Sequence, residues 1–154
     1  MSRINTVVSA GLLAGLFDIT DAFIFFGARG TKIMTIGQSI ASGLIGKAAY
    51  DGGWTTFAMG MGLHFAIAVC MALVFYLLTM IIPVIKQMIV VSGMVYGLAC
   101  WAVMNYVVLP ASRGDMHPHF PPVMGPVFYN AIFAHVILVG LTIALVTRSA
   151  LKGK

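Results

Sequence analysis

The sequence predicts an all-α integral membrane protein, with four transmembrane helices in an up-down bundle and one short interfacial or re-entrant helix between the first two. Two observations carry this prediction. The composition is 60% hydrophobic and only 8% charged, whereas soluble domains average about 25% charged residues. The apolar residues also gather in runs long enough to cross a bilayer, which takes about 20 helical residues.

We expect the first spanning helix at about 4–26. Arg3 precedes an apolar run, as it would in a signal peptide, but Asp18 and Asp21 interrupt that run and no convincing small-residue cleavage site follows. The next stretch, about 33–50, is too polar and too rich in glycine to span. Its isoleucines nevertheless keep a helical spacing, which favours a short helix at the interface or one that re-enters between the spanning helices.

We expect the other spanning helices at about 55–82, 87–109 and 127–146, all within a single membrane domain 1–154. Pro83 and Pro110 end the second and third helices, because proline cannot continue a helical hydrogen-bond ladder. The connection after Pro83 is very short, so the second and third helices should be antiparallel neighbours.

An even number of spanning helices places both termini on one side of the membrane. Basic residues are slightly more numerous on that side, which predicts that both termini are cytoplasmic. The net charge of +5 does not indicate a nucleic-acid partner, since the basic residues are scattered over termini and short loops, where they serve topology and contact lipid headgroups.

Polar residues inside the apolar runs are the candidate site. Asp18, His64 and His135 each lie about eight or nine residues from the same end of their helices, or about 12–14 Å deep at 1.5 Å per residue. Asn105 and Asp21 lie shallower along the same approach. Because polar groups within a membrane face a partner or a cavity, these five residues predict one ligand-binding cluster inside the bundle.

Several functions are compatible with such a cluster. One is a structural hydrogen-bonded network that fixes the order of the helices, as in an accessory subunit of a larger membrane complex. A second is binding or transport of a small polar ligand or cation, with Asp18 as charged anchor and the histidines as proton partners. A third is a bis-histidine haem b site, with His64 and His135 as axial ligands. We favour the second, and a small chain of this kind would enclose a pathway more easily as a homo-oligomer.

Other sites have less support. The sequence contains no recognisable catalytic motif, so we expect no enzyme, and the favoured interpretation needs neither a cofactor nor a metal. His117 and His119 flank Pro118 in a proline-rich loop, where they supply two candidate metal ligands, and two ligands do not make a site.

The order of polar and small residues resembles a family of small four-helix bacterial inner-membrane proteins. The resemblance covers about residues 11–147 and lies in Asp18, the segment 38–43, His64 with its neighbours, the segment 104–110, and Asn130 with His135. The stretch from His64 to His135 is also distantly similar to YagU-like inner-membrane proteins. The resemblance implies the four-helix topology and a bacterial inner membrane, and it implies no activity.

Overall fold

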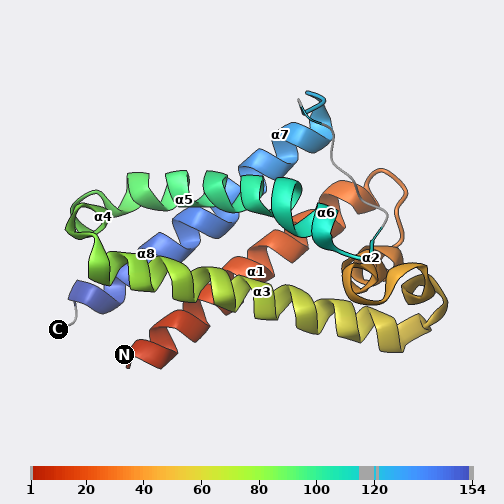
Figure 1. Ribbon diagram of the computed structural model, residues 1–154, viewed down its shortest axis with the longest axis horizontal. Coiled ribbons are helices and arrows are strands. Elements are labelled where there is room, and N and C mark those ends of the chain that lie inside the picture. Colours follow the sequence, from red (N-terminus) through yellow and green to blue (C-terminus); the bar gives the residue numbers. More distant parts are fainter. Residues whose placement is uncertain (1, 115–119, 121, 153–154) are drawn as a thin grey trace.

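Figure 1 shows the computed structural model of the chain, which describes residues 2–114, 120 and 122–152. Every regular element in this part of the chain is helical, so the predicted all-α fold is confirmed there. In chain order the elements are α1 (Arg3–Gly27), α2 (Ile33–Ile45), the 3-10 helix η1 (Gly46–Asp51), α3 (Gly53–Ile81), α4 (Pro83–Gln87), α5 (Ile89–Val103), the π-helix η2 (Met104–Val108), α6 (Leu109–Ala111), α7 (Pro126–Phe133), the π-helix η3 (Ala134–Leu141) and α8 (Thr142–Lys152).

Four helical rods are long and apolar enough to cross a membrane. They are α1, α3, the rod formed by α5, η2 and α6, and the rod formed by α7, η3 and α8. The fourth rod departs most from its expected bounds, since it continues to Lys152 instead of ending near residue 146. It continues because no glycine or proline interrupts the sequence between Gly140 and Gly153.

The helix between α1 and α3 is shorter than the expected 33–50. It ends at Ile45 because Gly46 has a φ of 68°, a backbone conformation that glycine adopts without steric cost. The chain then forms η1 before α3 begins. Gln38 holds α2 against α3, because its buried side-chain amide donates to the Gly53 carbonyl at 3.3 Å.

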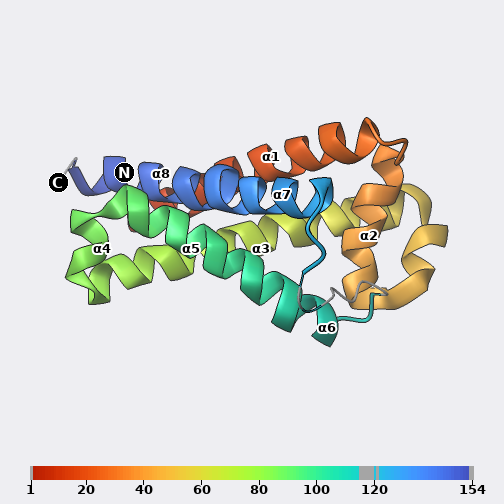
Figure 2. The ribbon, with the colours of Figure 1, turned by 90° about the horizontal axis from the view of Figure 1, so that it is seen from above.

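The rods form a bundle with two different ends. Both termini lie at one end, and α2 lies crosswise over α1 and α3 at the other, here called the α2 end (Figures 1 and 2). Within the bundle, α1 packs against α3 on one side and against η3 and α8 on the other, while α5 packs along η3. The expected placement of both termini at one end is therefore observed.

The two helices joined by the shortest connection make few contacts with each other. α3 and α5 follow one another through α4, but each packs mainly on other helices. Their principal link is Tyr96, whose hydroxyl donates to the Met71 carbonyl at 2.8 Å and whose ring contacts Phe75. Beyond Tyr96, toward the α2 end, space is left between α3 and the α5–η2–α6 rod, and the cavity described below occupies it.

Glycines bring the helices close where the packing is tightest. A Cβ atom on Gly97 would collide with the His135 carbonyl, and one on Gly60 would collide with the Gly37 carbonyl. Such contacts let backbones approach within a membrane, where packing is a main source of helix association. The buried core lies in the half of the bundle nearer the termini, and its largest members include Phe75, Tyr76 and Ile143.

Candidate functional site

A cavity of about 330 Å³ lies beneath α2, between α1, α3, η2 and η3. Most of the residues that line it are apolar. The polar side chains in its lining are Asp18, Ser39, Ser42, His64, Ser112 and His135. Three of the five predicted site residues, Asp18, His64 and His135, are therefore brought to one cavity. A volume of this size lies at the lower end of the range for small-molecule pockets.

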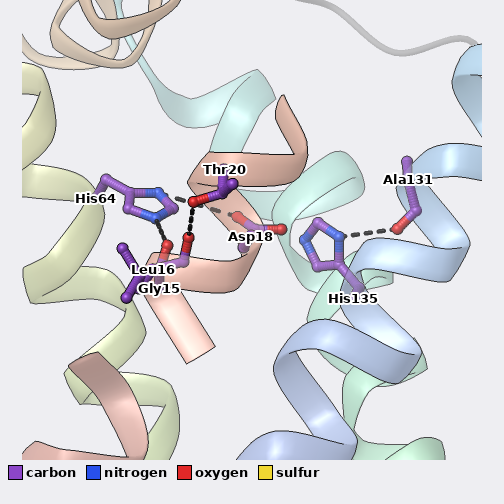
Figure 3. Close-up of polar contacts among 7 residues, drawn as sticks. All are labelled: Gly15, Leu16, Asp18, Thr20, His64, Ala131 and His135. Carbon is purple, nitrogen blue, oxygen red and sulfur yellow. Dashed lines mark hydrogen bonds and ion pairs between the residues drawn. The ribbon is translucent and has the colours of Figure 1, made fainter. Parts of the chain in front are cut away.

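Asp18 and His64 both line this cavity, and their side chains point toward each other (Figure 3). Nε2 of His64 lies 2.8 Å from the Gly15 carbonyl, which can only accept a hydrogen bond. In the neutral imidazole the proton is therefore on Nε2, and Nδ1 is left as an acceptor. Nδ1 lies 4.0 Å from Oδ2 of Asp18, which is too long for a direct hydrogen bond.

Two acceptors thus face each other across 4.0 Å in the Asp18–His64 pair. They repel one another unless a proton or another positive group lies between them. The side chains of His64 and Asp18 are only 13% and 24% exposed, so water screens this interaction weakly. The pair is therefore suited to hold one proton or one cationic group.

His135 reaches the cavity from the opposite rod and lies on the other side of Asp18 (Figure 3). Its Nδ1 lies 3.0 Å from the carbonyl of Ala131, four residues earlier in its own rod. Asp18 therefore has a histidine on either side (Figure 3). His135 belongs to the π-helix η3, and π-helical turns are frequent at functional sites because they widen the helix locally.

The three serine hydroxyls in the lining are also used as donors by the backbone. Ser39 donates to the Ile36 carbonyl at 2.7 Å, Ser42 to the Ser39 carbonyl at 2.6 Å, and Ser112 to the Leu109 carbonyl at 2.8 Å. A hydroxyl carries a single proton, so only its acceptor lone pairs remain. With neutral histidines, every polar side chain of the lining therefore offers acceptors to a ligand.

Asn105 and Asp21 do not line the cavity. The amide of Asn105 donates to the Trp101 carbonyl of its own rod at 2.9 Å. Asp21 accepts a hydrogen bond of 2.7 Å from Asn130, which links α1 to α7. These two predicted site residues have local or structural partners, and no contact of theirs with Asp18 through a hydrogen bond is present in the described residues.

Sequence reasoning missed the serines at the α2 end of the cavity. Ser39 and Ser42 lie away from the apolar stripe of their helix, which was a signal for a polar face. The sequence gives no orientation for a short crosswise helix, so that face could not be assigned to the site. Ser112 follows the third rod and had no periodic signal at all.

The geometry does not favour a haem between the two histidines. The Asp18 carboxylate lies between the imidazoles (Figure 3), and Nε2 of His64, a usual iron ligand, already faces the Gly15 carbonyl. Within the described part of the chain, no three His, Cys, Asp or Glu residues gather in a group that could hold a metal ion. His117 and His119 lie outside the described residues.

Comparison with known proteins leaves the site to be interpreted from its own chemistry. The chain matches no protein-family model, no curated protein and no solved structure.

Proposed function

We propose that this protein is a multi-pass membrane protein that binds and transports a small cation, with Asp18 as the charged anchor and His64 and His135 as proton partners. The observation that carries the proposal is that, with neutral histidines, the polar side chains lining the cavity offer a ligand hydrogen-bond acceptors and no free donors. The side chains of Asp18, His64 and His135 line the cavity, and the hydroxyls of its three described serines are already donated to backbone carbonyls. A ligand that supplies positive charge or N–H donors complements this lining, whereas an anion does not.

Depth adds to the argument. Asp18 lies in the middle of α1, a helix long and apolar enough to cross a membrane. An ionisable side chain at such a depth is costly and is typical of substrate or proton pathways. Among the described residues that line the cavity there is neither Lys nor Arg, so none of them supplies a permanent cation to Asp18.

The proposed setting is a bacterial inner membrane with both termini in the cytoplasm. By sequence, five basic residues belong to the end that holds the termini and four to the α2 end. The five are Arg3, Lys86, Arg148, Lys152 and Lys154, and the four are Arg29, Lys32, Lys47 and Arg113. This distribution supports cytoplasmic termini, because basic residues favour that side. A homo-oligomer is compatible with the proposal and is not required by it.

The proposal is tested by uptake of radiolabelled methylammonium and benzylammonium into proteoliposomes. We expect uptake by the wild type and a loss of about tenfold or more in Asp18→Asn, since hydrogen bonds to charged groups contribute about 1.5–3 kcal/mol and 1.4 kcal/mol is tenfold. Asparagine keeps the shape of the side chain and removes its charge.

Asp21→Asn is the matched control, because Asp21 lies one helical turn away on the same helix and does not line the cavity. It should retain uptake. Uptake that is equal in Asp18→Asn and wild type, or no uptake by the wild type, would contradict transport at this site. If the Asp18→Asn protein is folded, the first of these outcomes would also indicate that the polar cluster is a structural network.

A further inference from the structure

We infer that the cavity receives its ligand from the lipid, through a side entrance between Leu44 and Val108, and that the ligand is a lipophilic amine. The inference rests on the proposed function and adds to it the route of entry and the chemical class of the ligand. It is carried by the position of the exposed residues around the cavity and by the chemistry of its lining.

The first observation is that packing narrows the α2 end of the cavity. The backbone N–H of Arg113 donates to the Gly43 carbonyl at 2.9 Å, which ties the segment after α6 to α2. Gly114 is buried, and a Cβ atom there would crowd the hydroxyl of Ser42. Ser42 itself is only 3% exposed. These contacts of the described residues narrow the way from the medium beyond α2 to Asp18.

The second observation is where the lining reaches the surface. Among the described lining residues, only Leu44 and Val108 are exposed, at 51% and 38%. Both are apolar, and one lies near the end of α2 while the other ends η2. Val103 and Val107 on the same rod are also exposed, at 51% and 59%. An exposed valine face on a membrane-spanning rod faces hydrocarbon, so the entrance opens sideways into lipid.

The walls between this entrance and Asp18 are apolar, and Leu63, Ile67 and Met104 are among them. A ligand that passes them and then meets only acceptors needs two parts, an apolar body and a donor group. A weak base fulfils both requirements, because its neutral form dissolves in hydrocarbon and its protonated form pairs with a carboxylate.

Binding of a neutral amine at this site also conserves protons and charge. The neutral amine takes a proton from the Asp18–His64 pair in its protonated form, and the resulting ammonium group pairs with the Asp18 carboxylate. The proton moves from the acid to the amine nitrogen, so no bond to carbon changes and the net charge in the cavity stays the same. No ion has to cross the hydrocarbon for binding.

The entrance is tested by cysteine labelling of the full chain in nanodiscs, in a Cys70→Ala/Cys100→Ala background. Ala68→Cys places a thiol on the cavity wall, and Ala72→Cys, one turn away in the buried core, is the matched control. Two methanethiosulfonates that share one reactive group are compared, the neutral benzyl reagent and the charged trimethylammonium-ethyl reagent. Rates are normalised to Ala48→Cys, an exposed position of η1.

We expect the normalised rate at Ala68→Cys to be about tenfold or more higher for the benzyl reagent, a difference of roughly 1.4 kcal/mol in barrier. Ala72→Cys should react with neither reagent. Labelling of Ala68→Cys by the charged reagent at a normalised rate equal to that of the benzyl reagent would overturn the side entrance, because it would show an aqueous route.

Blocking variants locate the entrance. Val108→Trp should slow benzyl labelling of Ala68→Cys by about tenfold or more, whereas Val107→Trp, the exposed neighbour outside the lining, should not. If Val108→Trp fails to fold, Leu44→Trp with Ile45→Trp as its control makes the same test from α2. Equal rates in a blocking variant and its control would place the entrance elsewhere.

The ligand class is tested by protection in the same assay. 4-Phenylbutylamine should slow labelling of Ala68→Cys, and its uncharged isostere 4-phenylbutanol should not. In Ala68→Cys/Asp18→Asn, the amine should no longer slow labelling relative to the rate of that same variant without amine. Equal protection by both compounds, or by neither, would overturn the amine assignment. Labelling reports the entrance with no ligand bound, so a side entrance with amine protection but without cation uptake would refute only transport in the proposed function.

Discussion

The two histidines of the cavity are held by different kinds of hydrogen bond. His64 bonds from α3 to the Gly15 carbonyl of α1, so its bond joins two helices. His135 bonds to Ala131 within its own rod. Only the first bond is lost when the helices separate, which gives the two residues different roles in stability although both line the same cavity.

We therefore expect His64→Ala to lower the free energy of unfolding by about 0.6–2 kcal/mol, the range for interhelical hydrogen bonds in membranes. His135→Ala, which removes the same side chain, should cost less. Unfolding in mixed micelles by titration with dodecyl sulfate measures both values. His64→Gln should recover part of the lost free energy of unfolding if its amide reaches the Gly15 carbonyl. An equal loss in the two alanine variants would argue that the His64–Gly15 bond does not hold the two helices together.

At the residue scale, the sequence predicts how deep along its helix a polar residue lies. It does not predict the direction in which the side chain points. The rise per residue of a helix is fixed, so Asp18, His64 and His135 could be placed at one level by counting. Asn105 was expected in the same cluster, but its amide bonds back to Trp101 in the π-helical stretch η2. A π-helical turn changes the direction in which later side chains point, and the hydrophobic periodicity of the sequence does not predict such a turn.

At the scale of elements, glycines fix which helices lie close together. On α3, Gly60 lies under the Gly37 carbonyl of α2, while Gly62 has open space beside it. In the sequence the two glycines lie in the same apolar run, and nothing distinguishes one from the other. Only the packing of α2 on α3 separates the one that permits a close approach from the one that does not.

Gly60→Ala should therefore destabilise the protein by about 1–3 kcal/mol, the usual cost of forcing an extra methyl group into a packed site. Gly62→Ala should be neutral or stabilise by up to about 1 kcal/mol, because alanine is the better helix former. The same dodecyl sulfate titration compares the two. The interpretation of the α2–α3 contact would be wrong if Gly62→Ala were as harmful as Gly60→Ala.

The spanning rods were predictable at this scale because each is a long apolar run closed by glycine, proline or charge. The crosswise direction of α2 was left open between an interfacial and a re-entrant helix, since the pattern of a short helix does not give its angle to the bundle. Its attachment depends on tertiary contacts such as Gln38 to Gly53. These contacts join segments whose mutual position the sequence does not state.

At the scale of the whole molecule, the two ends of the bundle differ in charge and in shape. Both termini lie at the end opposite α2 (Figures 1 and 2). An even number of spanning rods requires this placement, so the arrangement of the termini followed from the count alone. Which end faces the cytoplasm depends on a small excess of basic residues and stays a prediction.

Epitope tags on the two termini should consequently share one side of the membrane. In sealed proteoliposomes, external protease should remove both tags from the same molecules and leave a tag inserted after Val123 intact in those molecules. Molecules inserted in the opposite orientation should lose the tag after Val123 and keep both terminal tags, which serves as an internal control. Loss of one terminal tag together with the inserted tag would show a different topology.

The link between Tyr96 and Met71 has a consequence for the kinetics of any flux. Met71 and Val139 both line the cavity. Val139 belongs to the packed core that includes Phe75, and Met71 packs against that core. If the protein transports a ligand as proposed, passage to the terminal end would require the Tyr96 hydroxyl to leave the Met71 carbonyl and this core to rearrange. Movements of packed helices take microseconds to milliseconds, so turnover would saturate with concentration as in a carrier, far below the rates of diffusion through an open channel.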